Sequence, residues 1–155
     1  MSRRAEIKLS ASEQRELLEQ ERIVVVSSFG PRGWPHSMPL WYVPRGEDIW
    51  VYTYAKSQKV KNLERDPRAT LLVETGHEYG ELRGVEIKAE AEIHRDMETV
   101  YELARELTVR YSDDISSVTG EAAEALKAQA RKRVAIRFDR KRIASWDHRK
   151  LGGTY

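Results

Sequence analysis

The side chains with the clearest chemical potential lie together in one short stretch of the sequence. Thr53 and Ser57 offer hydroxyl groups, and Lys56, Lys59 and Lys61 offer ammonium groups, around the expected start of a short helix. The first N–H groups of a helix have no partner inside it, and the helix dipole favours an anion at that end. Hydroxyls, free amides and lysines gathered at such a point are typical of a phosphate site. The stretch therefore predicts a bound phosphorylated cofactor.

The segments around this stretch show strand and helix patterns in turn. Residues 81–94 alternate apolar and charged side chains, which is typical of a strand with one face in water. Strands are predicted for residues 23–29, 36–43, 49–54, 69–74, 81–94 and 134–146, and helices from residue 10, after residue 57, and over residues 97–111 and 121–131. Most connections have hairpin length, and closing such a sheet removes its exposed edges. We therefore expect a mainly β fold, a six-stranded antiparallel barrel with added helices.

Two local patterns sharpen this expectation. Ser10 followed by Glu13 three residues later predicts a capping box at the start of the first helix. Pro39 has no N–H to donate to a neighbouring strand, so it predicts an edge, a bulge, or backbone that faces something other than a strand.

Composition limits the classes of protein to which the chain can belong. With 155 residues and no segment that resembles a linker, we expect a single domain over residues 1–155. The formal net charge of +2 is too small to favour a nucleic acid as the main partner. The absence of cysteine excludes disulfides and thiolate metal sites and is typical of a reducing cytoplasm.

Other features are expected to be absent. The first residues contain no apolar run of the signal-peptide kind, and no run of about 20 apolar residues predicts a membrane span. His77, His94 and His148 show no metal-ligand spacing, so no metal is expected. No nucleophile-base-acid pattern and no phosphate-binding glycine-rich loop is present, which is consistent with chemistry carried by a cofactor.

Three motifs together carry a resemblance to a known family. Residues 33–42 read Gly-Trp-Pro-His-Ser-Met-Pro-Leu-Trp-Tyr, residues 57–59 read Ser-Gln-Lys, and residues 62–69 read Asn-Leu-Glu-Arg-Asp-Pro-Arg-Ala. In this order they resemble the split-barrel flavin-binding superfamily, which includes pyridoxamine 5′-phosphate oxidase and the flavin- or deazaflavin-dependent oxidoreductases. The resemblance implies an FMN-binding split barrel in a homodimer, with a cofactor at the interface between the two protomers.

The resemblance also implies positions for the cofactor. Its phosphate would lie on Lys59 and Ser57, with Thr53 and Lys56 beside them. The chain segment along the ring would be His36, Ser37, Met38, Pro39 and Trp41. The C-terminal tail, with Trp146, Arg149 and the glycines before Tyr155, resembles an active-site tail in kind. It lacks the Arg-Leu-His sequence of true vitamin B6 oxidases, which argues against pyridoxamine phosphate as the substrate.

The cofactor is expected to be either coenzyme F-420 or FMN. The short chain and the motifs of residues 33–42 and 62–69 resemble the branch that binds coenzyme F-420, a deazaflavin with an anionic oligoglutamyl tail. Lysines and arginines near Lys59 suit that tail, although Lys61 and Arg65 are equally well explained as solvated surface charges. We therefore expect hydride transfer between coenzyme F-420 and a small unsaturated or conjugated substrate, with no catalytic side chain identified.

Three alternatives remain open. The first is an FMN-dependent oxidoreductase on the same fold. The second is a non-catalytic binder of flavin or haem, for which His36 and His148 would be the histidines to test. The third is a nucleic-acid-binding barrel, which the small net charge and the many acidic residues oppose.

Overall fold

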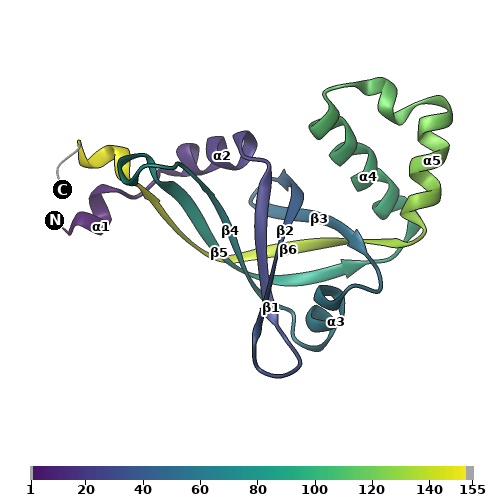
Figure 1. Cartoon of the computed structure of the whole chain (residues 1–155), viewed down its shortest axis with the longest axis horizontal. Helices are drawn as coiled ribbons and strands as arrows, with labels where there is room; N and C mark the ends of the chain where they lie inside the picture. Colours follow the sequence, from purple (N-terminus) through teal and green to yellow (C-terminus); the bar gives the residue numbers. More distant parts are fainter. Residues whose placement is uncertain (1, 153–155) are drawn as a thin grey trace.

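Six antiparallel strands form the centre of the protein. The structure is a computed structural model that describes residues 2–152. The strands close into a barrel in the order β1-β2-β3-β6-β5-β4 (Figure 1). Their bounds are β1 Ile23–Phe29, β2 Pro35–Arg45, β3 Asp48–Tyr54, β4 Arg68–Thr75, β5 Arg83–His94 and β6 Arg133–Asp147. This split-barrel architecture and the six predicted strands are confirmed.

The helices lie around the outside of the barrel and at its ends. They are α1 Arg3–Glu6, α2 Ala11–Gln20, α3 Gln58–Arg65, α4 Met97–Ser112 and α5 Gly120–Ala130, with 3₁₀ turns at Tyr79–Glu81, Ile115–Val118 and His148–Leu151. Figure 1 shows α4 and α5 as a pair on one side of the barrel and α3 near the tip of the β1–β2 hairpin. Among the described residues, no helix has the length and apolar character that a membrane crossing requires.

The sequence predicts most helix positions but not the shortest ones. The capping box is present, because Ser10 Oγ accepts from the backbone of Glu13 while the Glu13 carboxylate accepts from Ser10 N–H. The four-residue α1 and the 3₁₀ turns were not predicted, since elements this short have too few positions to show a periodic pattern.

Two apolar clusters hold these elements together. The larger fills the barrel, where side chains such as Tyr42, Leu71 and Phe138 are fully buried. The smaller lies between α4 and the outer faces of β2, β3 and β6, and includes Leu103 and Ala135. The helical pair is therefore attached to the barrel by a core of its own.

Strand β2 pairs with its two neighbouring strands over different lengths. This strand runs beside β1 from Pro35 to Trp41, but it pairs with β3 only from Tyr42 to Arg45. Beyond that point β3 turns away and pairs with β6 as far as Tyr54. Residues 36–41 of β2 therefore have a strand on one side only, in agreement with the edge predicted from Pro39.

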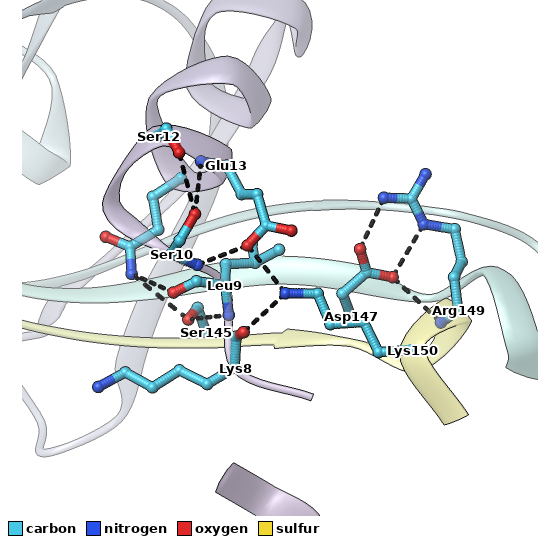
Figure 2. Close-up of polar contacts among 10 residues, drawn as sticks. Lys8, Leu9, Ser10, Ser12, Glu13, Ser145, Asp147, Arg149 and Lys150 are labelled. Atoms are coloured by element: carbon cyan, nitrogen blue, oxygen red, sulfur yellow. Dashed lines mark hydrogen bonds and ion pairs between the residues drawn. The ribbon is translucent and has the colours of Figure 1, made fainter. Parts of the chain in front are cut away.

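The two ends of the described chain are joined by polar contacts (Figure 2). Leu9 N–H donates to Ser145 Oγ at 3.1 Å, and Lys150 Nζ donates to the carboxylate of Glu13 at 2.8 Å. Asp147 is 2 % exposed and accepts two hydrogen bonds from the Arg149 guanidinium, at 2.9 and 2.6 Å. These contacts hold the 3₁₀ turn after β6 against the segment that precedes α2.

Asp147 makes the stabilising effect of these polar contacts depend on pH. Hydrogen bonds from Arg149 hold the pKa of the Asp147 carboxyl below its ordinary value. Its contribution is therefore complete above the ordinary aspartate pKa of about 4 and is lost as the pH falls through the lower folded-state pKa. We expect Asp147→Asn to cost about 1–2 kcal/mol at pH 7, because Arg149 is half-exposed and solvent weakens the pair.

Urea unfolding of wild type and Asp147→Asn between pH 3 and pH 7 measures this effect. The difference between the two proteins should be constant above about pH 5 and shrink below about pH 4. Asp139→Asn is the matched control, since Asp139 forms an exposed pair with Lys141. An equal cost for both substitutions would show that burial of Asp147 adds nothing.

Candidate functional site

The candidate site begins where β3 ends and α3 starts. Ser57 is the N-cap residue of α3, in extended conformation, and Asp66 ends the helix in front of Pro67. The helix turns one face into the barrel, where Val60 is fully buried and Leu63 nearly so. Packing of that apolar face fixes the N-terminus of α3 over the end of β3.

Lys59 is a buried cation without a carboxylate partner. The residue is 8 % exposed, and its Nζ donates to Thr53 Oγ1 at 3.0 Å. It forms no ion pair within the described part of the chain, whereas cations such as Arg68, Arg137 and Arg149 are each paired with an aspartate. Burial lowers the pKa of Lys59, and the nearby charge of Arg133 lowers it further. An anion at this point would relieve both effects.

The hydroxyl of Ser57 is also left without a partner. Its Oγ is buried and makes no hydrogen bond to the first turn of α3 or to any other described atom. Ser10, by contrast, caps α2 in the usual way. A buried polar atom without a partner costs free energy, so the uncapped serine indicates a group that this chain does not supply.

Arg133 is a second cation near the end of β3, on the face opposite Thr53. It begins β6 directly opposite Tyr54 in the strand register. Its guanidinium carbon lies 3.4 Å from the centre of the Tyr54 ring and 5.2 Å from that of Tyr52. Its Nε is buried without a hydrogen-bond partner, as is the Tyr52 hydroxyl. We refer to Thr53, Ser57 and Lys59 as the cradle.

Contacts of α3 connect the cradle with residues 36–41, the open stretch of β2. Asn62 is fully buried and donates from Nδ2 to Ser28 Oγ at 3.1 Å, and Ser28 is paired with His36 across β1 and β2. His36 therefore lies on the face that α3 covers, and its Nδ1 is buried without a partner. Met38 lies on the same face and is 41 % exposed, because β3 has already turned away.

Because side chains alternate along a strand, the other predicted residues of β2 lie on the opposite face from His36 and Met38. Ser37, Pro39 and Trp41 point to the outer face, where Ser37 Oγ hydrogen-bonds Ser27 Oγ at 2.7 Å. Trp41 stacks on Tyr111 of α4 with ring centres 4.3 Å apart. The structure thus brings the side chains of His36 and Met38 toward α3, whereas the other three reach a ligand there only through their backbone.

The tail residues lie at the other end of β6. Trp146 covers Gly84 of β5, where an added Cβ would lie 2.5 Å from the indole ring, and Arg149 binds Asp147. The whole length of β6 separates them from Arg133 (Figure 1). Within one protomer they do not meet the cradle. Residues 153–155, including Tyr155, lie outside the described residues.

Lys56 completes the placement of the predicted phosphate residues. It lies exposed in the turn before α3 and forms no ion pair within residues 2–152. Arg133, Tyr52 and Tyr54 were not predicted as site residues. The sequence carries a weak sign of Arg133, since Arg131-Lys132-Arg133 is a run of three cations just before the last strand. Only the register of β3 with β6 shows that the third of them lies opposite Tyr54.

Comparisons with known proteins decide the family. A family model described as pyridoxamine 5′-phosphate oxidase matches residues 10–147. The chain belongs to this family. The match covers β1 to β6 and α2 to α5, and so includes the whole cradle. No protein of curated function matches the sequence.

Solved structures agree with this assignment. The conserved hypothetical protein Rv2991 from Mycobacterium tuberculosis is 36 % identical, with a TM-score of 0.89 over 100 % of this chain and 95 % of that one. An F420 reductase is 22 % identical, with a TM-score of 0.65 over 83 % of this chain and 94 % of that one. A FAD-binding protein from Mesorhizobium loti is 17 % identical, with a TM-score of 0.65 over 89 % and 94 %. The last two likenesses show the shared fold alone.

Proposed function

We propose that this member of the pyridoxamine 5′-phosphate oxidase family is an oxidoreductase that binds coenzyme F-420, with the cofactor phosphate on the cradle. The observation that carries the proposal is Lys59, a buried ammonium group with no carboxylate partner in the described chain. An isolated buried charge is costly, and a phosphate would supply the missing opposite charge. The free hydroxyl of Ser57 and the N-terminus of α3 suit the same anion.

The ring of the cofactor would lie along the open stretch of β2. Residues 36–41 have no strand on the side that β3 leaves, so their backbone groups on that side are free to hydrogen-bond a polar ring edge. His36 Nδ1, buried without a partner, is a further polar atom on the face that α3 covers. These groups would bind and orient the ring next to the phosphate.

Charge favours the deazaflavin over FMN. Lys56, Lys132 and Arg133 lie at the same end of the barrel as Lys59, and none forms an ion pair among the described residues. A single phosphate cannot neutralise so many cations, whereas an anionic oligoglutamyl tail can.

The chemistry would come from the cofactor and the positioning from the protein. A bound deazaflavin supplies hydride transfer, here to a small unsaturated or conjugated substrate. Lys59 and Ser57 fix the phosphate, and the backbone of β2 fixes the ring. The apolar side chains beneath α3, with Val60 and Leu63, exclude water from the barrel side of the site.

A second copy of the chain is the partner that we propose for the outer face of β1 and β2. Ile23, Val25 and Phe29 of β1 share this face with Pro39 and Trp41 of β2. Leu72 of β4 extends it, and Ile23, Phe29 and Trp41 are each more than 40 % exposed. Several exposed apolar side chains on one face are typical of a protein interface. The tail residues Trp146 and Arg149 would then reach a cofactor only across that interface.

Parallel titrations of cofactor-free protein with coenzyme F-420 and with FMN test the proposal. Binding of F-420 with a preference of at least about tenfold, equivalent to 1.4 kcal/mol, supports it. Weaker binding of F-420 in high salt would confirm that charges hold the tail. Preference for FMN would make the protein a flavin enzyme of the same family.

Two controls separate the remaining alternatives. Haem is titrated under the same conditions into wild type and His36→Ala, since His36 Nδ1 is buried without a hydrogen-bond partner. Tight haem binding that depends on His36, without binding of either flavin, would overturn the oxidoreductase proposal. If coenzyme F-420, FMN and haem all fail to bind, the proposed function is wrong, whereas the family and the fold still hold.

A further inference from the structure

Asn62 is a polar side chain at a position of α3 where fold stability alone would favour an apolar one. It is fully buried, together with the apolar side chains of Val60 and Leu63 on the same short helix. Burial of an amide is costly unless its hydrogen bonds are made, and asparagine has a lower helix propensity than leucine. An apolar side chain would avoid both costs. The contacts that the Asn62 amide makes therefore need an explanation beyond helix packing.

The partners of the Asn62 amide hold it in one orientation. Its Oδ1 accepts from Gln58 Nε2 at 2.8 Å and, more weakly, from the Arg65 guanidinium at 3.5 Å. Because a guanidinium can only donate, the amide atom that faces Arg65 is the oxygen. The Nδ2 group then points to β1, where it donates to Ser28 Oγ at 3.1 Å. A buried amide with its hydrogen bonds made is thus fixed between α3 and β1, and such a network specifies one geometry.

This hydrogen bond connects the two halves of the proposed cofactor site. Ser28 is 3 % exposed and lies opposite His36, the first residue of the open stretch of β2. Among the described strands, only β1 runs beside that stretch, so the position of the stretch depends on β1. Helix α3 carries Lys59 and begins after Ser57, both of the cradle. Asn62 therefore ties the helix that bears the phosphate site to the strand that holds the ring site.

We propose that Asn62 is a positioning residue, whose hydrogen bond to Ser28 sets the separation between the cradle and the open stretch of β2 so that one cofactor reaches both. The inference rests on the proposed function and states how its phosphate site and ring site are kept in place relative to each other. A ligand that spans two sites gains from the second only when their separation matches its own dimensions. A ligand that occupies the cradle alone gains nothing from that separation. Asn62 should therefore affect the affinity for a whole cofactor and not the affinity for phosphate.

Two probes distinguish positioning from a merely structural role. Inorganic phosphate occupies the cradle alone, whereas coenzyme F-420 spans the cradle and the open stretch; FMN takes its place if the wild type prefers FMN. Titrations of cofactor-free wild type and Asn62→Leu with each probe measure the two affinities without any redox activity. Leucine keeps much of the side-chain volume and removes the amide. We expect Asn62→Leu to weaken binding of the spanning cofactor about tenfold or more and to change phosphate affinity by less than about twofold.

Further variants assign the effect to the hydrogen bond between Asn62 and Ser28. Ser28→Ala removes the other partner and should weaken cofactor binding in the same way. The double variant should bind no more weakly than the weaker of the two single variants, because both changes break one interaction. Gln14→Leu is the matched control, since Gln14 is a buried amide on another helix, α2, and donates to the Leu9 carbonyl at 3.1 Å. It should lower the Tm without changing cofactor affinity, and thermal unfolding of every variant shows that the fold is intact.

The outcomes separate the inference from the function on which it rests. Cofactor affinity that is unchanged in either Asn62→Leu or Ser28→Ala overturns the inference and leaves the proposed function in place. Equal losses for phosphate and cofactor also overturn it, because Asn62 would then shape the cradle alone. An equal loss of cofactor affinity in Gln14→Leu overturns it as well, since general destabilisation would be the cause. Absence of binding of both F-420 and FMN to the wild type overturns the two proposals together.

Discussion

Replacing Lys59 with methionine is expected to weaken cofactor binding by about 10- to 150-fold, the equivalent of one charge-assisted phosphate contact of about 1.5–3 kcal/mol. Methionine keeps much of the aliphatic length that packs beneath α3 but removes the ammonium group. Because Lys59 Nζ lies 3.0 Å from Thr53 Oγ1, its loss also leaves that hydroxyl without a donor. Titration of cofactor-free wild type and Lys59→Met with the preferred flavin measures the change.

The same substitution should raise the stability of the cofactor-free protein. Burial lowers the pKa of Lys59, so the folded state holds the charged form at a cost that the unfolded state does not have. Removal of the charge should gain about 1 kcal/mol in unfolding free energy, or about 2–4 °C in Tm. A substitution that weakens binding and stabilises the fold would identify a residue kept for its ligand.

The pH dependence gives a second readout of the same charge. Between the lowered folded-state pKa of Lys59 and its ordinary value of 10.5, the unfolded chain binds more protons than the folded one. Wild-type stability should therefore rise with pH across that window, and Lys59→Met should lack the rise. Lys61→Met is the matched control, since Lys61 is exposed on the same helix. Equal effects of the two substitutions on binding would show that the phosphate has been placed wrongly.

Substitution of Val25 with arginine is expected to convert a dimer into a monomer. Val25 lies at the centre of the outer face, paired with Pro39 on one side and with Leu72 on the other. In a two-fold dimer each protomer would bring its own arginine into the interface, and two unpaired buried charges would cost several kcal/mol. Sedimentation or light scattering of the wild type and the variant measures the mass.

The chain offers a matched control for this experiment. Ile115 is 65 % exposed on the 3₁₀ turn between α4 and α5, away from β1, so Ile115→Arg adds the same charge outside the proposed interface. It should leave the mass unchanged. A monomeric wild type would refute the proposed dimer, and a dimer that persists in Val25→Arg would move the interface to another surface.

The strands and the main helices could be predicted because their signals are local. Alternation along residues 81–94 and the β-branched run of β1 fix the period and the length of those strands. The capping box of Ser10 and Glu13 and the Asp-Pro stop after α3 mark the ends of helices. The cradle could be predicted for the same reason, because Thr53, Ser57 and Lys59 are close in sequence as well as in space.

The parts that could not be predicted depend on register between distant strands. Arg133 meets Tyr54 only because β6 pairs with β3 in one register, and a shift of one residue would turn its side chain to the other face. The division of β2, with His36 and Met38 toward α3 and Trp41 outward, likewise follows from its pairing with β1. Asp147 was not singled out, because its burial depends on the segment before α2.

The open stretch of β2 also bears on how the protein behaves without its ligand. Backbone amides and carbonyls along residues 36–41 face no described strand on one side, and such a row is a template on which a strand from another molecule can add. Pro39 removes one donor from the middle of the row and interrupts any long foreign pairing. A cofactor ring lying along this stretch would cover the remaining backbone amides and carbonyls. The cofactor-free protein should therefore be the form that aggregates, and ligand supplied during expression should increase the yield of soluble protein.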